Sequence, residues 1–369
     1  MQPSARLPIL SLIDARLERR MRPTPLYVDL HRAEDGSAIG AYPKLSVKNV
    51  FFIVGPTAAG KSALAADVAY EIGAEIVSAD AFQIYRGLDL LTAKPDSDTL
   101  QKVPHHLIST ISLHEEMNAE KFRGAASRVI GEIHSHGKLA IVVGGSGLYI
   151  KALTHGLEPL PESDPELRGK LNTMRPNELR SELLRLDPGV SGRIDMKNRR
   201  RLIRALEICL LTGKPASTLR KQWTITGEGL PIVTLGKADD LGRPGSVIPG
   251  TGIFVFRDRE DLYNRINDRV EGMFENGVIE EVRATGATSS TASQMIGWRE
   301  TLELLEGKMS ISQCVASIQQ ATRRYAKRQL TWFRRQINFE PLNLSLLSHN
   351  EAVNWISLRA RRSFAHWDD

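Results

Sequence analysis

Residues 50–80 read VFFIVGPTAAGKSALAADVAYEIGAEIVSAD, and they carry the strongest structural signal in the chain. The apolar run Val50–Val54 is followed by Gly55-Pro56-Thr57-Ala58-Ala59-Gly60-Lys61-Ser62, which fits the pattern G-x-x-x-x-G-K-[ST] at every fixed position. The apolar run predicts a strand, and Ser62–Ile72 predicts an amphipathic helix. A strand that enters a helix through such a loop is the context in which the pattern is meaningful. The sequence therefore predicts a P-loop that holds a diphosphate.

The chemistry of this loop follows from its composition. Glycines at both ends let successive backbone N–H groups point inward, and the following helix adds the positive end of its dipole. Lys61 is expected to pair with phosphate oxygens, and the Ser62 hydroxyl is expected to be a ligand of Mg²⁺. The alternative is an ordinary strand-turn-helix whose glycines occur by chance. The pattern favours a diphosphate but does not say which one.

Asp80 ends a second, mostly apolar run, Glu75–Asp80, which predicts a buried parallel strand. Ligands of open α/β sheets bind at the carboxyl edge, so this carboxylate should lie beside the P-loop. It can hold a metal, cap the next helix or act as a general base. We favour the base, because a metal-binding acid normally ends an uninterrupted apolar strand, whereas this run ends Ser-Ala-Asp.

The chain then continues to alternate as a doubly wound domain does. Residues 121–134 have helical spacing, and Leu139–Val143 predicts a buried strand that ends in Gly144-Gly145-Ser146-Gly147. Glycine lets backbone approach a ligand closely, and the Ser146 hydroxyl could bond a substrate or nucleotide. The alternative is a plain tight turn before a helix at Tyr149–Leu153.

Between residues 155 and 221 the strand pattern stops. Pro165–Leu186 and Asn198–Leu211 predict helices, and the second opens with Arg199, Arg200 and Arg201. This basic cluster is either a solvated turn or an anion contact. Residues 224–251 lack any period and predict a loop.

Two later helices carry further cations. After a predicted strand at Gly252–Phe256, the helix Asp261–Asn276 has Arg265 and Arg269 along one side, where an exposed charge is the alternative to an anion ligand. Projected as a helix, residues 318–337 gather six cations and no acid within about 140° of arc. These cations are Arg323, Arg324, Lys327, Arg328, Arg334 and Arg335. Such a face usually meets solvent, but this density favours a phosphate backbone.

The overall composition is that of a globular protein. The 369 residues are 41% hydrophobic and 25% charged, and the net charge of +6 weakly favours a polyanionic partner. Cys209 and Cys314 lie in apolar helical patterns without metal-like spacing, so buried thiols in a reducing compartment are expected. No apolar stretch reaches about 18 residues, so we expect no membrane span and a cytoplasmic location.

These patterns predict an α/β fold with a P-loop NTPase-like parallel sheet flanked by helices and a helical insertion domain. We divide the chain into a leader at 1–45, a catalytic core at 46–154 and 222–340, an insertion at 155–221 and a C-terminal tail at 341–369. The leader carries several arginines interrupted by acids, and we expect it to be disordered or lightly packed.

Six blocks of the chain, in order, resemble one enzyme family. They are GPTAAGKS (55–62), SADAFQIYRGLDLLTAKP (78–95), VVGGSGLYIKAL (142–153), NRRRLIRALE (198–207), QMIGWRE (294–300) and ATRRYAKRQLTWF (321–333). Together they resemble the P-loop prenyltransferases that modify tRNA, the tRNA dimethylallyltransferases. No Cys/His zinc-finger spacing follows them, which favours a form of the bacterial type.

The resemblance implies a reaction and its residues. A dimethylallyl group would pass from dimethylallyl diphosphate to N6 of the adenosine next to the anticodon of tRNA, with Mg²⁺ as cofactor and a monomer acting on the anticodon stem-loop. Asp80, Thr57 and Arg269 would be catalytic, with Asp80 accepting the N6 proton. The diphosphate would be bound by Gly55, Pro56, Thr57, Ala58, Ala59, Gly60, Lys61 and Ser62. The tRNA contacts would be Asp80, Ala81, Phe82, Gln83, Ser146, Arg200, Arg201, Leu202, Ile203, Arg204, Gln294, Met295, Ile296, Gly297, Trp298, Arg299, Ala321, Thr322, Arg323, Arg324, Tyr325, Ala326, Lys327 and Arg328.

Three other functions share parts of the pattern. An adenylate-directed isopentenyltransferase, which makes cytokinin, would share the P-loop and Asp80 but would not need the basic face or the insertion. A small-molecule kinase would bind ATP and use Asp80 to activate a hydroxyl, but it should carry an arginine-bearing lid that is not evident here. A nucleotide switch should carry a base-specificity motif of the N-K-x-D kind, which the sequence lacks.

Overall fold

One parallel sheet lies at the centre of the chain. The computed structural model describes residues 50–157, 160–192, 194–219, 252–336 and 339–365, so the predicted leader and the loop at 224–251 lie outside it. The sheet is six-stranded, with the order β3-β2-β4-β1-β5-β6, and all its neighbours pair in parallel. Its strands are β1 (Val50–Val54), β2 (Ala74–Ser78), β3 (His105–His106), β4 (Leu139–Gly144), β5 (Gly252–Phe256) and β6 (Glu340–Asn343).

The register of the sheet decides which loops meet. Val54 of β1 pairs with Gly144 of β4 and with Phe254 of β5, while Ser78 of β2 pairs with Val143. The carboxyl ends of these four strands therefore lie at one edge. The segments that leave this edge are the P-loop, the turn at Asp80, the second glycine-rich loop and the start of the helix after β5.

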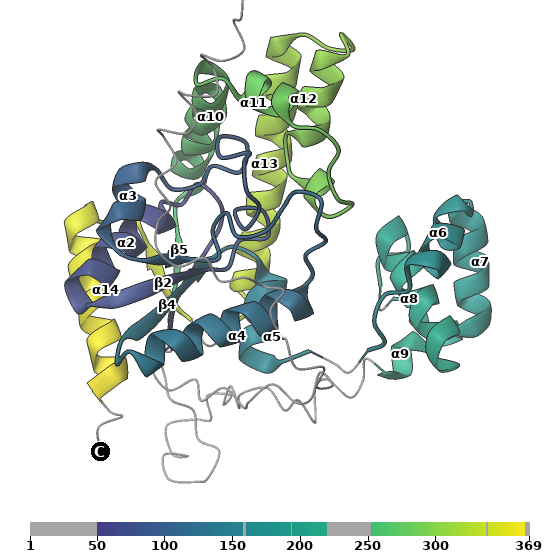
Figure 1. The fold of residues 1–369 in the computed structure, drawn as a ribbon, viewed down its shortest axis with the longest axis horizontal. Coiled ribbons are helices and arrows are strands. Elements are labelled where there is room, and N and C mark those ends of the chain that lie inside the picture. Colours follow the sequence, from purple (N-terminus) through teal and green to yellow (C-terminus); the bar gives the residue numbers. More distant parts are fainter. Residues whose placement is uncertain (1–49, 158–159, 193, 220–251, 337–338, 366–369) are drawn as a thin grey trace, which may run out of the picture. The chain divides into compact units, whose positions relative to one another are not determined.

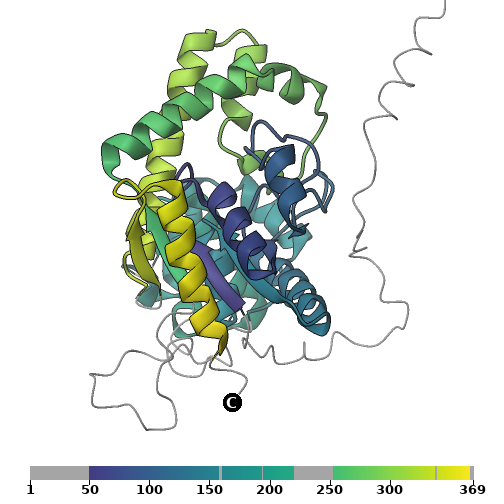
Figure 2. The same cartoon turned by 90° about the vertical axis from the view of Figure 1, so that its left-hand side faces the viewer.

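Helices cover both faces of the sheet. Side chains alternate along each strand, so Phe51 and Ile53 of β1 face one way and pack in one cluster with α2 (Lys61–Ile72) and α14 (His349–Ala365). Figure 2 shows α14, the yellow helix at the front, running beside β1 and α2. On the other face lie α4 (Ala119–Ser135) and α5 (Gly147–His155) (Figure 1). The predicted α/β class with a parallel sheet is confirmed.

The C-terminal segment corrects the predicted end of the core. From the sequence we placed residues 341–369 in a tail, but β6 pairs with β5 and α14 packs on α2. The apolar residues Ala352, Val353 and Ile356 recur at helical spacing and are buried in the same cluster as β1. Burying that stripe makes α14 part of the core as far as the described chain extends.

The remaining core helices stand at the carboxyl side of the sheet. They are α3 (Ser97–Lys102), α10 (Arg259–Glu275), α11 (Val278–Ala284), α12 (Trp298–Leu305) and α13 (Ile311–Phe333). The long helices α10 and α13 pack on each other. Helix α13 is the predicted basic helix; it begins at Ile311, seven residues before the expected Ile318, and ends at Phe333. Among the described helices, none is both long and apolar enough to cross a membrane.

The insertion is helical, as predicted, and has a hydrophobic core of its own. Its helices are α6 (Pro165–Thr173), α7 (Pro176–Leu186), α8 (Arg199–Thr212) and α9 (Ala216–Leu219). The sequence predicted helix throughout residues 165–186, but the chain breaks between α6 and α7. Pro176 disfavours the helical conformation of the residue before it, and Arg175 is extended at φ −70° and ψ 151°.

Candidate active site

The P-loop joins β1 to α2, and its surroundings explain both glycines. A Cβ on Gly55 would lie 2.1 Å from the carbonyl oxygen of Val255, so only glycine allows β5 to approach this closely. Gly60 has a φ of +93°, in the left-handed region that L side chains rarely adopt, and it caps α2 without a side-chain hydrogen bond. The first N–H groups of α2 have no partner within the helix, so they can bind a ligand.

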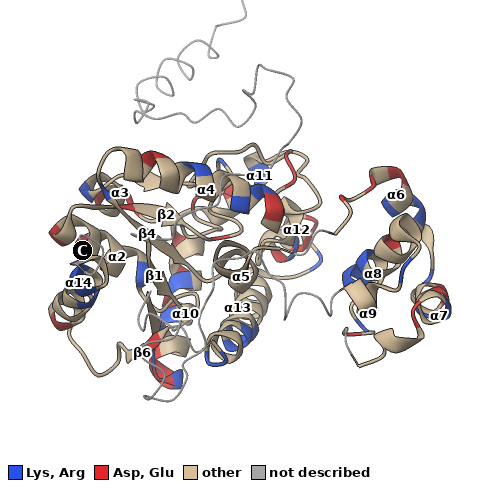
Figure 3. Cartoon of the chain, turned by 90° about the horizontal axis from the view of Figure 1, so that it is seen from below, with Lys and Arg blue, Asp and Glu red and all other residues tan. Residues whose placement is uncertain are grey.

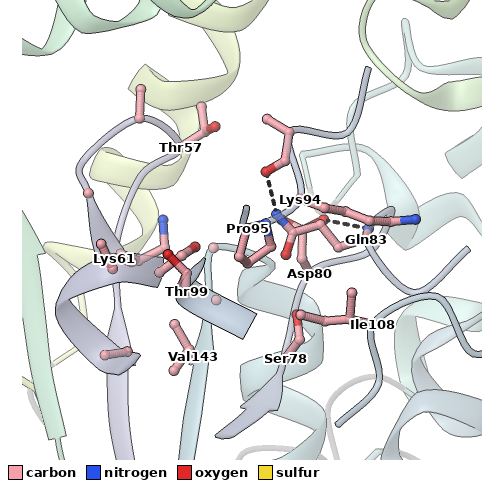
Figure 4. A pocket seen from close by; sticks show the side chains of 18 of the residues that line it. Thr57, Lys61, Ser78, Asp80, Gln83, Lys94, Pro95, Thr99, Ile108 and Val143 are labelled. Carbon is pink, nitrogen blue, oxygen red and sulfur yellow. Dashed lines mark hydrogen bonds between the residues drawn. The ribbon is translucent and has the colours of Figure 1, made fainter. Parts of the chain in front are cut away.

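A cavity of 530 Å³ opens beside this loop. Cationic side chains from separate elements line it, namely Lys61 of α2 and Arg265 and Arg269 of α10. Figure 4 shows Lys61, Thr57 and Asp80 around the cavity. A chamber with this cation set fits a diphosphate, because each positive charge can pair with phosphate oxygens.

Burial lowers the pKa values of two of these cations, Lys61 and Arg269. It lowers the pKa of the Lys61 ammonium to about 8, against the opposing pull of the Asp80 carboxylate. Burial likewise lowers the pKa of the Arg269 guanidinium to about 10, with Asp80 again opposing. Both groups are held away from water in a charged form, so an anion that enters the cavity would be strongly favoured.

Asp80 lies two residues beyond the end of β2, in a turn rather than on the strand. Its Oδ1 accepts hydrogen bonds from the N–H groups of Phe82 at 2.9 Å and Gln83 at 3.3 Å, and Asp80 also lines the cavity. The carboxylate therefore shapes its own turn through one oxygen, and no regular helix follows for it to cap. Among the described residues, none donates a hydrogen bond to the other oxygen.

Two arginines hold the backbone of the P-loop: Arg257, for which we predicted no role, and Arg265, which also lines the cavity. Arg257 donates from Nε to the carbonyl oxygen of Ala59, and Arg265 donates from Nε to that of Ala58, both at 2.9 Å. Arg257 directly follows β5, so its position at the carboxyl end of a core strand was the available signal. Arg265 precedes Arg269 by one helical turn, a spacing that already indicated a shared face.

Lys94 lines the same cavity, but its ammonium is bound by other groups of the protein. Its ammonium donates to the carbonyl oxygens of Tyr85 and Gly87 and to the Ser109 hydroxyl, and it pairs with Asp89 at 2.6 Å. With these partners it anchors the loop before α3 instead of presenting a free charge to a ligand.

The second glycine-rich loop lines the cationic cavity through Gly144 and Gly145, and it also packs closely against other parts of the protein. A Cβ on Gly144 would lie 2.3 Å from the Ala79 carbonyl oxygen, and a Cβ on Gly147 would lie 2.7 Å from the ring of Trp332. The Ser146 hydroxyl accepts a hydrogen bond at 3.0 Å from the Ala81 N–H. Ser146 thus fixes the turn that carries Asp80.

A smaller cavity of 70 Å³ adjoins the first and shares Thr57, Asp80 and Arg269 with it. Residues from three separate sequence blocks of the predicted tRNA contacts converge on this second cavity, namely Phe82, Met295, Ile296, Thr322 and Tyr325. Its remaining lining includes Leu91, Val270, Met273 and Ile318. The site therefore joins a cationic chamber to an apolar one, and the three predicted catalytic residues stand at the junction.

Other predicted contact residues are buried elsewhere. Ala326 packs against α10, and Trp298 is only 6% exposed. Leu202 and Ile203 are buried in the core of the insertion. The side chains of these four residues are not available to a partner, because in each helix they occupy the apolar face opposite the charged one.

The insertion divides its arginines between structure and surface. Glu207 is fully buried, and it accepts hydrogen bonds from Arg168 and Arg204. Arg204 also donates to the Pro161 carbonyl oxygen. Arg200 and Arg201, by contrast, are exposed at the start of α8. Of the arginines that we predicted to contact tRNA in the insertion, Arg200 and Arg201 are therefore the two whose side chains are exposed.

The predicted basic face of α13 is present on the surface. Arg324, Lys327 and Arg328 are exposed, as are Arg334 and Arg335 just beyond the end of the helix. Figure 3 shows these basic segments in blue along α13. Arg323 differs, because it lies over the Tyr263 ring and donates a hydrogen bond to Asn267.

The donor set for a metal ion is sparse. Within the described residues, no group of three or more His, Cys, Asp or Glu side chains could hold an ion. Ser62, the predicted protein ligand, lines the cationic cavity. This fits Mg²⁺, which typically keeps several waters and binds through one or two protein oxygens together with the phosphates of a substrate.

The sequence of the chain is similar to those of known proteins. Residues 83–336 match the family model described as IPP transferase. The chain is 41% identical over 288 residues to tRNA dimethylallyltransferase 1 of Citrifermentans bemidjiense, covering 77% of this chain and 88% of that protein. It is 39% identical over 308 residues to tRNA dimethylallyltransferase of Geobacter sulfurreducens, covering 81% and 92%.

A solved structure extends the agreement to three dimensions. The full-length tRNA isopentenylpyrophosphate transferase of Bacillus halodurans superposes with a TM-score of 0.59 at 30% identity, covering 87% of this chain and all of that one. The two proteins therefore share sequence and fold over most of their length. The chain belongs to the IPP transferase family, in which the two relatives above are tRNA dimethylallyltransferases.

Proposed function

We propose that this enzyme transfers a dimethylallyl group from dimethylallyl diphosphate to N6 of the adenosine on the 3′ side of the tRNA anticodon. One observation carries the proposal. A cation-lined chamber and an apolar chamber meet at Thr57, Asp80 and Arg269, and these chambers match the charged and the apolar half of the donor. The names of the relatives support the same reaction.

The cationic chamber would hold the diphosphate. Lys61 and Arg269 supply buried positive charge, and the loop amides at the start of α2 supply hydrogen bonds. Ser62 and the diphosphate oxygens would hold Mg²⁺, which when bound would neutralise charge on the leaving group. Lys61 donates to the Pro56 carbonyl oxygen at 2.6 Å, so its ammonium lies against the loop.

The transfer breaks one bond and forms another, and the residues at the junction of the two cavities take up the charge and the proton. The allylic C–O bond breaks, its electron pair leaves with the diphosphate, and the N6 lone pair of the adenine forms the new C–N bond. Arg269 and Lys61 stabilise the charge that develops on the leaving oxygen. Asp80 accepts the proton that N6 loses, and its position in the lining of both cavities supports this role.

The acceptor would be presented by the tRNA anticodon loop. An adenine must leave its stack before an enzyme can reach its edge, and the cavity lined by Phe82, Met295 and Tyr325 offers apolar and aromatic surface to a flipped base. The exposed cations of α13 would bind the phosphate backbone beside it.

The test is to incubate the full chain with dimethylallyl diphosphate, Mg²⁺ and an anticodon stem-loop, and to identify the nucleosides by mass spectrometry. We expect one adenosine, next to the anticodon, to gain a dimethylallyl group in place of an N6 hydrogen. A stem-loop with guanosine at that position is the matched control. Prenylation of free adenylate but not of the stem-loop would refute the proposal in favour of a cytokinin-forming enzyme. Phosphate transfer from ATP would refute it in favour of a kinase.

A further inference from the structure

A buried glutamine on α13 interrupts the packed side of that helix. Gln329 is only 6% exposed and lies on the same side as Ala326 and Phe333, both of which are buried in the core. A polar side chain at such a position must satisfy its donors and acceptors within the protein, because leaving them unpaired is costly. Gln329 also lines the cationic cavity.

Both ends of this amide are used by loops of the active site. The Gln329 Oε1 accepts a hydrogen bond from the Thr57 N–H, and its Nε2 donates one to the Gly145 carbonyl oxygen, each at 2.9 Å. A backbone N–H can only donate and a carbonyl can only accept, so these partners fix the orientation of the amide. A Cβ on Gly145 would lie 2.3 Å from Nε2, so the glycine is what admits the amide.

Thr57 is consequently held from two sides. Gln329 binds its backbone, and Arg269 donates to its hydroxyl oxygen at 2.9 Å. Thr57 also lines both cavities. A backbone N–H of a P-loop would ordinarily be free for an anion, whereas this one is committed to Gln329.

We propose that Gln329 is a positioning residue for the transfer reaction, acting through Thr57. Its amide fixes the Thr57 backbone, so that the Thr57 hydroxyl and the Arg269 guanidinium bound to it stay at the junction of the two cavities. The role in catalysis rests on the proposed function above, whereas the effect on the position of Thr57 does not.

The first test replaces Gln329 by methionine, which has a similar length but makes neither hydrogen bond. We expect the single-turnover rate at saturating substrates to fall by roughly 10- to 100-fold, the scale for misplacing a catalytic group by up to about 1 Å. Binding of inorganic diphosphate should change by less than about threefold, because Lys61 and Ser62 remain. The matched control is Gln319→Ala on the same helix, which loses one hydrogen bond to Glu271 and should keep its rate. An unchanged rate in Gln329→Met would overturn the proposal.

A double-mutant cycle separates positioning from general stability. If Gln329 acts through Thr57, Gln329→Met should cost less than about threefold in a Thr57→Val background, because the hydroxyl that it positions is already gone. Rate losses that simply multiply in the double variant would show that the two residues act independently, and the proposal would fail.

A second variant covers the case in which methionine is not tolerated. Gln329→Glu keeps an acceptor for the Thr57 N–H, but its ionised carboxylate cannot donate to Gly145. Protonation restores that donor, so the rate relative to the parent protein should recover as pH falls through a carboxyl pKa that burial raises above about 4.3. A constant ratio across pH would count against the amide bridge.

Hydrogen exchange of the Thr57 amide tests the geometry without any transfer reaction. The Thr57 amide should be protected in the parent protein and in Gln319→Ala, and it should exchange faster in Gln329→Met. If the parent chain transfers no prenyl group, the proposed function fails, yet this comparison still decides whether Gln329 fixes Thr57. Equal exchange in all three proteins would refute the bridge itself.

Discussion

Replacing Asp80 by asparagine separates its chemical role from its structural one. The carboxylate uses Oδ1 to accept the N–H groups of Phe82 and Gln83. The carbonyl oxygen of asparagine can accept the same two hydrogen bonds, so the turn should persist. What the substitution removes is the negative charge and the ability to accept a proton.

The structure sets the expected magnitudes. Loss of a positioned proton acceptor should lower the single-turnover rate by roughly 10² to 10⁴. Asp80→Ala, by contrast, also removes two hydrogen bonds, at about 0.5 to 1.5 kcal/mol each, so its Tm should fall by several degrees as well. The Asp80 charge supports the protonated forms of Lys61 and Arg269, so its loss should lower both pKa values further. The rate is therefore measured as a function of pH from below 7 upward, which separates loss of charge on Lys61 from loss of the base.

The assay is a single turnover with saturating donor and excess enzyme, run with Tm and tRNA affinity as parallel measurements. We expect Asp80→Asn to be slow, to melt near the parent protein and to bind tRNA normally. Added Mg²⁺ should not restore the rate, because the group removed is a base and not a metal ligand. Near-normal turnover in Asp80→Asn would remove this residue from the mechanism, and rescue by Mg²⁺ would reassign it to metal binding.

Three further outcomes follow from the described interactions. Burial lowers the pKa of Lys61 to about 8, so affinity for inorganic diphosphate should be present below that pH and weaken as pH rises through it, by up to about tenfold per unit. Replacing Arg324, Lys327 and Arg328 by glutamine should weaken tRNA binding and reduce its salt slope by up to about 0.7 to 0.9 for each cation that pairs with a phosphate. Glu207→Ala should destabilise the insertion by about 1 to 3 kcal/mol, because Arg168 and Arg204 lose their buried partner but are exposed enough for water to replace part of it. Limited proteolysis should then cut the insertion before it cuts the sheet domain.

Matched variants make these outcomes decisive. Lys61→Arg keeps its charge at high pH, and equal pH profiles for the two proteins would rule out Lys61 as the titrating group. Neutralising Arg283 and Lys308, which are exposed outside α13 and are not among the predicted tRNA contacts, should leave the salt slope alone. Glu166→Ala removes an exposed ion pair of the insertion and should be nearly neutral; an insertion equally resistant in both glutamate variants would contradict the role of Glu207.

Elements that carry their own local signal could be predicted from the sequence. The P-loop could be recognised because its glycines, lysine and serine have fixed spacing between a strand and a helix. The strand Gly252–Phe256 was predicted with its observed bounds, because its apolar run is shorter than a typical helix and is rich in β-branched and aromatic residues. The basic face of α13 followed from helical periodicity alone.

Helical and strand periodicity in the sequence could not predict how far apart the elements lie in the fold. Met295, Tyr325 and Phe82 belong to three sequence blocks, and only the packing of α13 and the loop before α12 against the carboxyl edge of the sheet brings them to one cavity. The C-terminal segment looked like a tail because its short strand and single helix have no motif. It joins the core because the exposed edge of β5 and the apolar side of α2 offer it partners.

The glycine-rich loop between β1 and α2, the α/β class, the helical insertion and the identity of the charged residues could thus all be predicted from the order of the amino acids. Which of those cations form ion pairs within the protein was settled only by packing, since Arg204 pairs with Glu207 and Lys94 with Asp89, while Lys61 and Arg269 line the cavity and, among the described residues, form hydrogen bonds to uncharged groups only. The physical reason is that a hydrogen bond or an ion pair depends on separations of a few ångströms, and these are fixed only when the elements pack. Gln329 shows this most directly, because a glutamine on a helix acquires its role only where two loops meet it.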